Sequence, residues 1–172
     1  MSSQPNILVI LTDQQTQRAV SAYGNPYLHT PCMDTLVHGG VSFENSYCTA
    51  PVCSPSRSSL LTGLMPHQTG VEINGPSIKP EVPTLGDVFQ QGGYQSFYTG
   101  KWGLGDRRGF NFLEGEYPKG IPQQYGTNTD PIWTDQAVNF LHRFKQQEIS
   151  SSQPFLLCVS LHNPHDICYW VM

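Results

Sequence analysis

Apolar stretches that end in polar residues recur along this chain, and they restrict its fold more than any other feature. The continuous aliphatic run from Ile7 to Leu11 ends at Thr12-Asp13, as expected of a parallel strand covered on both faces. A second apolar run, from Phe155 to Leu161, ends in the same way at His162-Asn163-Pro164-His165. Parallel strands need crossover connections, which are usually helices, so the predicted class is α/β with a mostly parallel sheet.

Helix and strand patterns alternate between these two runs. Helices are predicted from Met33 to His38, closed by Gly39-Gly40, and from Pro83-Thr84 to Gly92-Gly93. Strands are predicted from Val41 to Tyr47 and from Tyr94 to Tyr98. Residues 105–131 are rich in Gly and Pro and are predicted to be irregular. A last helix is expected to be capped by Thr134 and to carry an apolar face made of Ala137, Val138, Leu141 and Phe144.

Three chemically active side chains follow directly after predicted strands. Asp13, Lys101 and His165 each lie just beyond the end of one of these runs. Ligands of open α/β sheets bind at the carboxyl ends of parallel strands, so these three side chains are expected to converge on one edge of the sheet. An acid, an ammonium group and an imidazole together predict a metal-assisted site for an anion.

The segment from Cys53 to Gly63 reads Cys-Ser-Pro-Ser-Arg-Ser-Ser-Leu-Leu-Thr-Gly. Pro55 suits the first turn of a helix, and Gly63 suits its end. Arg57 lies about one helical turn beyond Cys53. The free amide groups at the start of this helix would face the anion, which places Cys53 beside the predicted site.

This segment closely resembles the signature of the type I sulfatases, and the resemblance extends over roughly residues 5 to 166. It implies an alkaline-phosphatase-like three-layer α/β sandwich, of which residues 1–172 would be the N-terminal part, truncated on the C-terminal side. It also implies that Cys53 is oxidised to formylglycine, whose hydrated aldehyde binds a divalent cation and attacks the sulfur of a sulfate ester. Arg57 would neutralise and orient this group.

The resemblance also implies a metal site. Asp13 stands where the family has its first metal-ligating acid, and Gln14 stands where many members have a second aspartate. Choline-sulfatase-like and phosphonate-monoesterase-like relatives carry glutamine at this position. The implied ligands are therefore Asp13, Gln14 and the modified Cys53, and the implied metal is Ca²⁺, with Mg²⁺ or Mn²⁺ as alternatives.

Two further motifs carry implied catalytic roles. The stretch Gly100-Lys101-Trp102-Gly103-Leu104-Gly105 resembles the family's Gly-Lys-Trp-His-Leu-Gly, so Lys101 would hold a sulfate oxygen while Gly103 replaces a histidine. The segment from His162 to Asp166 resembles the family's Pro-His-x-Pro, with Ile167 in place of the second proline. His165 would then act on the leaving alcohol.

Composition excludes some partners. The formal net charge of −4 and the lack of a Lys/Arg cluster argue against nucleic acid and anionic membrane surfaces. No apolar stretch is long enough to span a membrane, and the N-terminus lacks the pattern of a signal peptide. The cysteines are odd in number and irregularly spaced, which fits a reducing compartment, so a cytoplasmic location is predicted. They are Cys32, Cys48, Cys53, Cys158 and Cys168.

Three functions stay open on the sequence alone. The first is hydrolysis of a small sulfate ester, which would require the missing C-terminal half or a partner chain, because further metal ligands and a second sulfate-binding lysine lie downstream in the family. The second is a truncated, non-catalytic fragment, in which lost strands leave apolar surface uncovered. The third is hydrolysis of a phosphonate or phosphate monoester by the same scaffold, which Gln14 keeps open.

Overall fold

The computed structural model describes residues 4–113, 126–149 and 152–170, and its strands form one parallel sheet. The sheet has the order β1-β4-β2-β3. Its strands are β1 (Ile7–Asp13), β2 (Gln95–Gly100), β3 (Asn111–Phe112) and β4 (Phe155–Pro164). The helices are α1 (Pro31–Gly39), α2 (Cys53–Thr62), α3 (Pro66–Thr69), α4 (Leu85–Gln91) and α5 (Gly126–Lys145). Short 3₁₀ helices are η1 (Gln17–Ala19), η2 (Ser21–Tyr23) and η3 (His165–Trp170).

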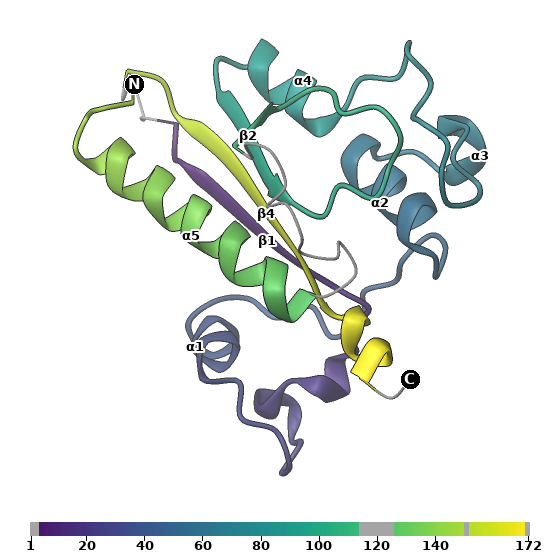
Figure 1. Cartoon of the computed structure of the whole chain (residues 1–172), viewed down its shortest axis with the longest axis vertical. Helices are drawn as coiled ribbons and strands as arrows, with labels where there is room; N and C mark the ends of the chain where they lie inside the picture. Colours follow the sequence, from purple (N-terminus) through teal and green to yellow (C-terminus); the bar gives the residue numbers. More distant parts are fainter. Residues whose placement is uncertain (1–3, 114–125, 150–151, 171–172) are drawn as a thin grey trace.

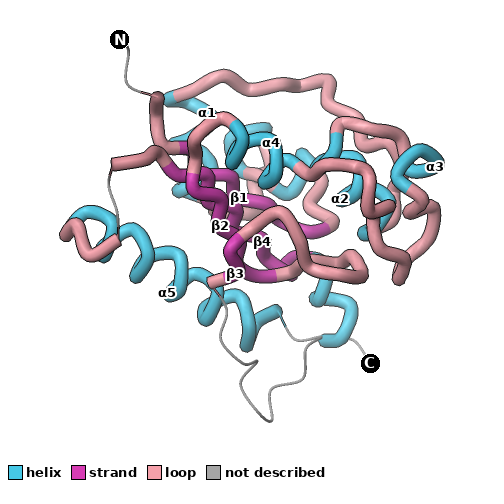
Figure 2. The backbone as a smooth tube through the Cα atoms, turned by 90° about the horizontal axis from the view of Figure 1, so that it is seen from above, coloured by secondary structure: helices cyan, strands magenta, loops and turns pink. Residues whose placement is uncertain are grey.

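Helices cover both faces of the sheet, which confirms the predicted three-layer α/β sandwich. The long helix α5 lies along one face, while α2 and α4 lie on the other (Figures 1 and 2). Strand β4 separates the two cores because its side chains alternate between the faces. Leu156 and Cys158 pack toward α2 and α4 together with Tyr98 and Leu61, whereas Phe155, Leu157 and Val159 pack toward α5.

The strands end on the same side of the sheet, where Asp13, the last residue of β1, pairs with Pro164, the last residue of β4. In the register of the sheet, Leu11 of β1 and Gly100 of β2 both pair with Ser160 of β4. The residues that follow these positions therefore emerge along one edge. This edge holds the candidate site.

Two predicted elements differ from the structure. No strand forms over residues 41–47, where the side chains of Val41, Phe43 and Tyr47 are 81%, 80% and 87% exposed. Alternation of apolar and polar residues predicts a strand only where a neighbouring strand can pair with it. Strand β1 is parallel as predicted, but the prediction that it is covered on both faces is wrong, because Leu8 and Ile10 are about half exposed on this outer strand of the described sheet.

Helix α5 begins at Gly126 and not at Thr134, so the predicted cap is wrong. The helix includes Pro131, and the Thr134 hydroxyl donates to the carbonyl of Asp130 within it. The start of the helix is held by contacts with distant residues, since the N–H of Gly126 donates to the carboxylate of Asp166. Residues 114–125 of the segment predicted to be irregular lie outside the described part of the chain.

Candidate active site

Cys53 is the first residue of α2, as the sequence predicts. Pro55 lies in the first turn, and the helix ends at Gly63, whose left-handed backbone (φ 72°) lets its N–H donate to the Ser59 carbonyl. At the start of the helix the N–H of Ser54 donates to Asn74 Oδ1 at 3.0 Å. The partly buried Cys53 side chain thus sits at the positive end of the helix dipole, a favourable position for an anion.

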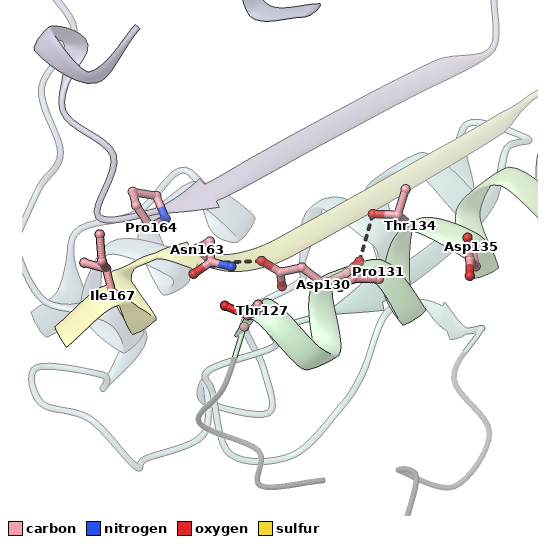
Figure 3. Close-up of a pocket in the computed structure, with 9 residues that line it drawn as sticks. Thr127, Asp130, Pro131, Thr134, Asp135, Asn163, Pro164 and Ile167 are labelled. Atoms are coloured by element: carbon pink, nitrogen blue, oxygen red, sulfur yellow. Dashed lines mark hydrogen bonds between the residues drawn. The ribbon is translucent and has the colours of Figure 1, made fainter. Parts of the chain in front are cut away.

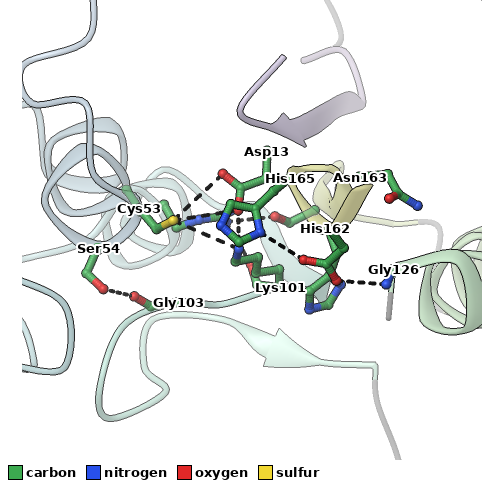
Figure 4. Close-up of polar contacts among 12 residues, drawn as sticks. Asp13, Cys53, Ser54, Lys101, Gly103, Gly126, His162, Asn163 and His165 are labelled. Carbon is green, nitrogen blue, oxygen red and sulfur yellow. Dashed lines mark hydrogen bonds and ion pairs between the residues drawn. The ribbon is translucent and has the colours of Figure 1, made fainter. Parts of the chain in front are cut away.

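Asp13 is the centre of the candidate site. It ends β1, is 8% exposed and contacts the Lys101 ammonium group directly (Figure 4). Its Oδ2 atom lies 3.8 Å from Cys53 Sγ and 3.8 Å from Arg57 Nη2. The buried carboxylate therefore faces two cationic groups and position 53 at the same time.

Arg57 lies one turn into α2 and is 7% exposed. Its Nη1 atom donates to the Lys101 carbonyl and to Ser160 Oγ, both at 2.7 Å, and it lies 3.4 Å from the Tyr98 hydroxyl. Its buried Nε has no hydrogen-bond partner among the described residues. The guanidinium thus binds the sheet edge with one nitrogen and leaves a second N–H for another acceptor.

Lys101 follows β2, and its Nζ lies 4.0 Å from Cys53 Sγ in addition to its contact with Asp13. Gly103, two residues later, has a left-handed backbone (φ 68°), and its carbonyl accepts a hydrogen bond from Ser54 Oγ. A Cβ atom placed on Gly103 would lie 2.9 Å from Arg57 Cδ. The position that holds histidine in the family motif is therefore occupied by a glycine against which Arg57 packs.

His165 begins η3 directly after β4 and joins the same group. Asp13, Cys53 and His165 each offer one potential metal-ligand atom, and these atoms all lie within 4.8 Å of one another. His162 points elsewhere, because its ring Nδ1 and its N–H both contact Asp130. Of the two histidines, the one singled out from the sequence is the one that reaches the site.

Gln14 is a predicted metal ligand whose side chain lies outside the group formed by Asp13, Cys53 and His165. Its side chain is exposed, and among the contacts of the described residues none joins it to Asp13 or Cys53. Its backbone is left-handed (φ 60°), which is uncommon for a residue with a side chain and often marks a functional site.

Two buried acids that support the site were not predicted. Asp130 accepts hydrogen bonds from the N–H groups of His162 and Asn163 at 2.7 and 2.9 Å. Burial raises the pKa of Asp130, but the bonds from His162 and Asn163 outweigh it and leave the pKa below its ordinary value. Asp166 accepts from His165 Nδ1 at 2.8 Å. Only its place next to His165 could have identified it from the sequence.

Two cavities lie beside the end of β4. The larger, about 670 Å³, lies between the start of α5 and residues from Asn163 to Ile167 (Figure 3). The smaller, about 260 Å³, is lined by the loop from Gly100 to Gly105 together with Arg107 and His162. Lys101 lines only the smaller one, so the smaller cavity adjoins the group around Asp13 and Cys53.

Among the described helices, none combines the length and hydropathy needed to cross a membrane.

Comparison with known proteins gives one consistent result. The sulfatase family model matches residues 5–170. The chain is 33% identical to the Delta 4,5-hexuronate-2-O-sulfatase of Bacteroides thetaiotaomicron, over 98% of this chain and 36% of that protein. It is 30% identical to the N-acetylglucosamine-6-O-sulfatase of the same bacterium, over 95% of this chain and 31% of that protein.

Solved structures agree in fold. A 2-O GAG sulfatase superposes with a TM-score of 0.79 at 32% identity, covering 98% of this chain and 37% of that one. A protein solved in complex with its substrate D-glucosamine-2-N,6-O-disulfate gives a TM-score of 0.81 at 29% identity, covering 95% and 35% of the two chains. The chain thus spans about a third of the length of the relatives that it matches.

Proposed function

This chain belongs to the sulfatase family, and from that premise we propose that it supplies the nucleophile half of a sulfuric ester hydrolase. One observation carries the proposal. Cys53 lies at the start of α2 within 4.0 Å of both Asp13 and Lys101, from two different strand ends. A nucleophile, an acid and a cation are thus held together beside a helix N-terminus, where an anionic ester is electrostatically favoured.

The family implies a divalent metal and a formylglycine, and the residues present fit both. Asp13 offers hard carboxylate oxygens next to position 53, and the modified residue 53 would offer oxygen in place of sulfur. We propose Ca²⁺ as the metal, held by Asp13, position 53 and Gln14 after a change of its side-chain rotamer. When bound, the metal would raise the nucleophilicity of an oxygen at position 53 and offset the charge of the ester. Ca²⁺ takes six to eight oxygens, so these residues supply part of its shell.

The other side chains have separate roles in this proposal. Lys101 binds an ester oxygen, and Arg57, whose Nη1 holds the sheet edge, neutralises the negative charge at position 53. His165 faces Asp13 and Cys53 from the end of β4, and it is the residue placed to transfer a proton to the leaving oxygen. The substrate class we propose is a sulfate ester of a sugar, which is what the names of the two Bacteroides relatives given above describe.

The test uses the chain co-expressed with a formylglycine-generating enzyme. Mass spectrometry reads the chain mass and the state of Cys53, and turnover is measured with 4-nitrophenyl sulfate and sulfated monosaccharides. The metal is removed with a chelator and Ca²⁺, Mg²⁺ or Mn²⁺ is added back singly. Cys53→Ala is expected to lower turnover by on the order of 10³-fold or more, because the nucleophile is removed. Cys48→Ala, an exposed cysteine outside the site, is the matched control and is expected to leave turnover unchanged.

The same experiment separates the alternatives. Faster turnover of 4-nitrophenyl phosphate than of the sulfate would replace the proposal with a phosphomonoesterase. A converted Cys53 without any turnover would show that the chain needs further sequence or a partner chain. An unmodified thiol without turnover, in a host that converts other sulfatases, would leave a non-catalytic member of the family.

A further inference from the structure

A buried carboxylate lies directly behind His165. Asp166 is 3% exposed, and each of its two oxygens has a separate partner. Oδ1 lies 2.8 Å from His165 Nδ1, and Oδ2 accepts a hydrogen bond from the N–H of Gly126, the first residue of α5, at 2.7 Å (Figure 4). The carboxylate therefore links the histidine of the site to the start of a long helix packed against the sheet.

These contacts fix where the imidazole carries its proton. An ionised carboxylate has acceptors only, so Nδ1 must be the donor in its bond to Asp166. The neutral ring has one donor and one acceptor nitrogen, which leaves Nε2 as the acceptor. Since Nδ1 is bound to Asp166, Nε2 is the ring nitrogen left to face Asp13 and Cys53.

We propose that Asp166 is a positioning residue that holds His165 in the Nδ1–H tautomer and keeps its Nε2 directed into the site. The tautomer follows from the contact between Nδ1 and an ionised Asp166 carboxylate. The consequence for catalysis rests on the proposed sulfatase function, in which Nε2 takes up the proton released at position 53 when the nucleophile attacks. The ring is then an imidazolium beside the Asp166 carboxylate, and Nε2 passes this proton to the leaving oxygen.

The substitution Asp166→Asn tests the tautomer because an amide has one acceptor and one donor group. The amide oxygen can accept from the buried N–H of Gly126, which places the NH₂ group against His165 Nδ1. The opposite rotamer would point two donors at each other at the start of α5 and is disfavoured. Nδ1 must then accept, so the proton moves to Nε2 and the site loses its free ring nitrogen.

The measurement is long-range ¹H–¹⁵N NMR of the histidine-labelled protein at about pH 8.5, above the ordinary pKa of histidine. The wild type is expected to show a protonated Nδ1 and an unprotonated Nε2 at His165, and Asp166→Asn is expected to exchange the two signals. Asp130→Asn is the matched control, because Asp130 binds His162 and the backbone but not His165. It is expected to leave the His165 signals unchanged.

Two results would overturn the proposal. An Nε2–H tautomer at His165 in the wild type would do so without any variant, so the test does not depend on whether Asp166→Asn folds. An unchanged His165 spectrum in a folded Asp166→Asn protein would do so as well. Neither result depends on turnover, so failure of the sulfatase proposal is seen separately.

Turnover provides a second readout where it is present. Asp166→Asn is expected to lower kcat by roughly 10²- to 10⁴-fold for esters of alkyl alcohols, because the leaving oxygen of these esters must receive a proton as it departs. It is expected to change kcat much less for 4-nitrophenyl sulfate, whose leaving group departs easily. An equal loss for both esters would show that Asp166 acts on the fold and not through His165.

Discussion

At Gly103 the chain departs from the family motif, and the structure shows what occupies the space. The residue has φ 68°, and the aliphatic part of the Arg57 side chain packs against its Cα. A side chain at this position would meet both a strained backbone and Arg57. Restoring the histidine of the motif would therefore require the Arg57 side chain to shift.

We expect Gly103→Ala to destabilise the protein by more than Gly63→Ala, measured by denaturant unfolding. Both glycines have a left-handed backbone, which costs a residue with a side chain about 1–2 kcal/mol. A Cβ on Gly63 meets nothing within 4 Å, whereas a Cβ on Gly103 lies 2.9 Å from Arg57 Cδ. The difference between the two variants thus isolates the contact with Arg57. Equal losses in the two variants would show that this contact has no energetic effect.

The residues of the site were predictable where strand ends placed them. Asp13, Lys101 and His165 follow three strands of one parallel sheet, and their convergence follows from its topology. The acceptors of Arg57 were not predictable, because the Lys101 carbonyl and Ser160 lie 44 and 103 positions away along the chain. Gln14 was assigned from the motif, and its role as a ligand stays a prediction.

Helix α5 is the element whose start the sequence misplaced. Its first turns are stabilised by two carboxylates: Asp130 in the helix accepts from the N–H groups of His162 and Asn163 at the end of β4, and Asp166 in η3 accepts from the N–H of Gly126. Local signals, such as Thr134 before an apolar face and Pro131 as a helix breaker, contain no information about these distant contacts. Strands β1, β2 and β4 and helix α4 were predicted well because apolar runs and the Thr84 cap are local features, whereas β3 was not predicted and the strand expected over residues 41–47 does not form.

Asp130→Asn is expected to lower the free energy of unfolding by about 1–3 kcal/mol at neutral pH. The N–H groups of His162 and Asn163 each donate to one carboxylate oxygen of Asp130, and the substitution replaces one of these two acceptors with an NH₂ group. The folded-state pKa of Asp130 lies below its ordinary value, so the carboxylate stabilises the fold above about pH 4. This contribution is lost as the pH falls through the folded-state pKa. The gap between wild type and variant should therefore narrow in acid.

Urea unfolding at neutral pH and near pH 3 measures this gap. Asp135→Asn, an exposed acid on the same helix, is the control and is expected to change stability by less than about 0.5 kcal/mol. A gap for Asp130→Asn that stays constant between the two pH values would contradict the assigned role of its charge.

The whole molecule is organised around β4, whose alternating side chains belong to two separate cores. The three-layer arrangement was predictable, since a continuous apolar run requires cover on both faces of the sheet. The exposure of Leu8 and Ile10 on β1 was expected only in general terms, as uncovered apolar surface. The cytoplasmic location stays a prediction.

Cysteine labelling should report the unfolding of the molecule as a whole. Burial in the central strand raises the pKa of the Cys158 thiol to about 12, so this residue is expected to resist alkylation in the folded protein. Cys32 and Cys48 are exposed and should react at once with iodoacetamide. Peptide mapping by mass spectrometry, with and without denaturant, compares the three sites. Labelling of Cys158 in native protein as fast as Cys32 would show that the sheet opens readily.

The contacts of Arg57 restrict how this site could change during evolution. One of its nitrogens bonds α2 to the ends of β2 and β4, so losing the side chain would leave Ser160 and the Lys101 carbonyl without that partner. Among the described residues, the polar contacts of the Cys53 side chain are long, 3.8–4.0 Å to Asp13 and Lys101, so Cys53 could be replaced with little effect on folding. A stable, inactive descendant of this protein would therefore be expected to differ at position 53 and to retain arginine at position 57.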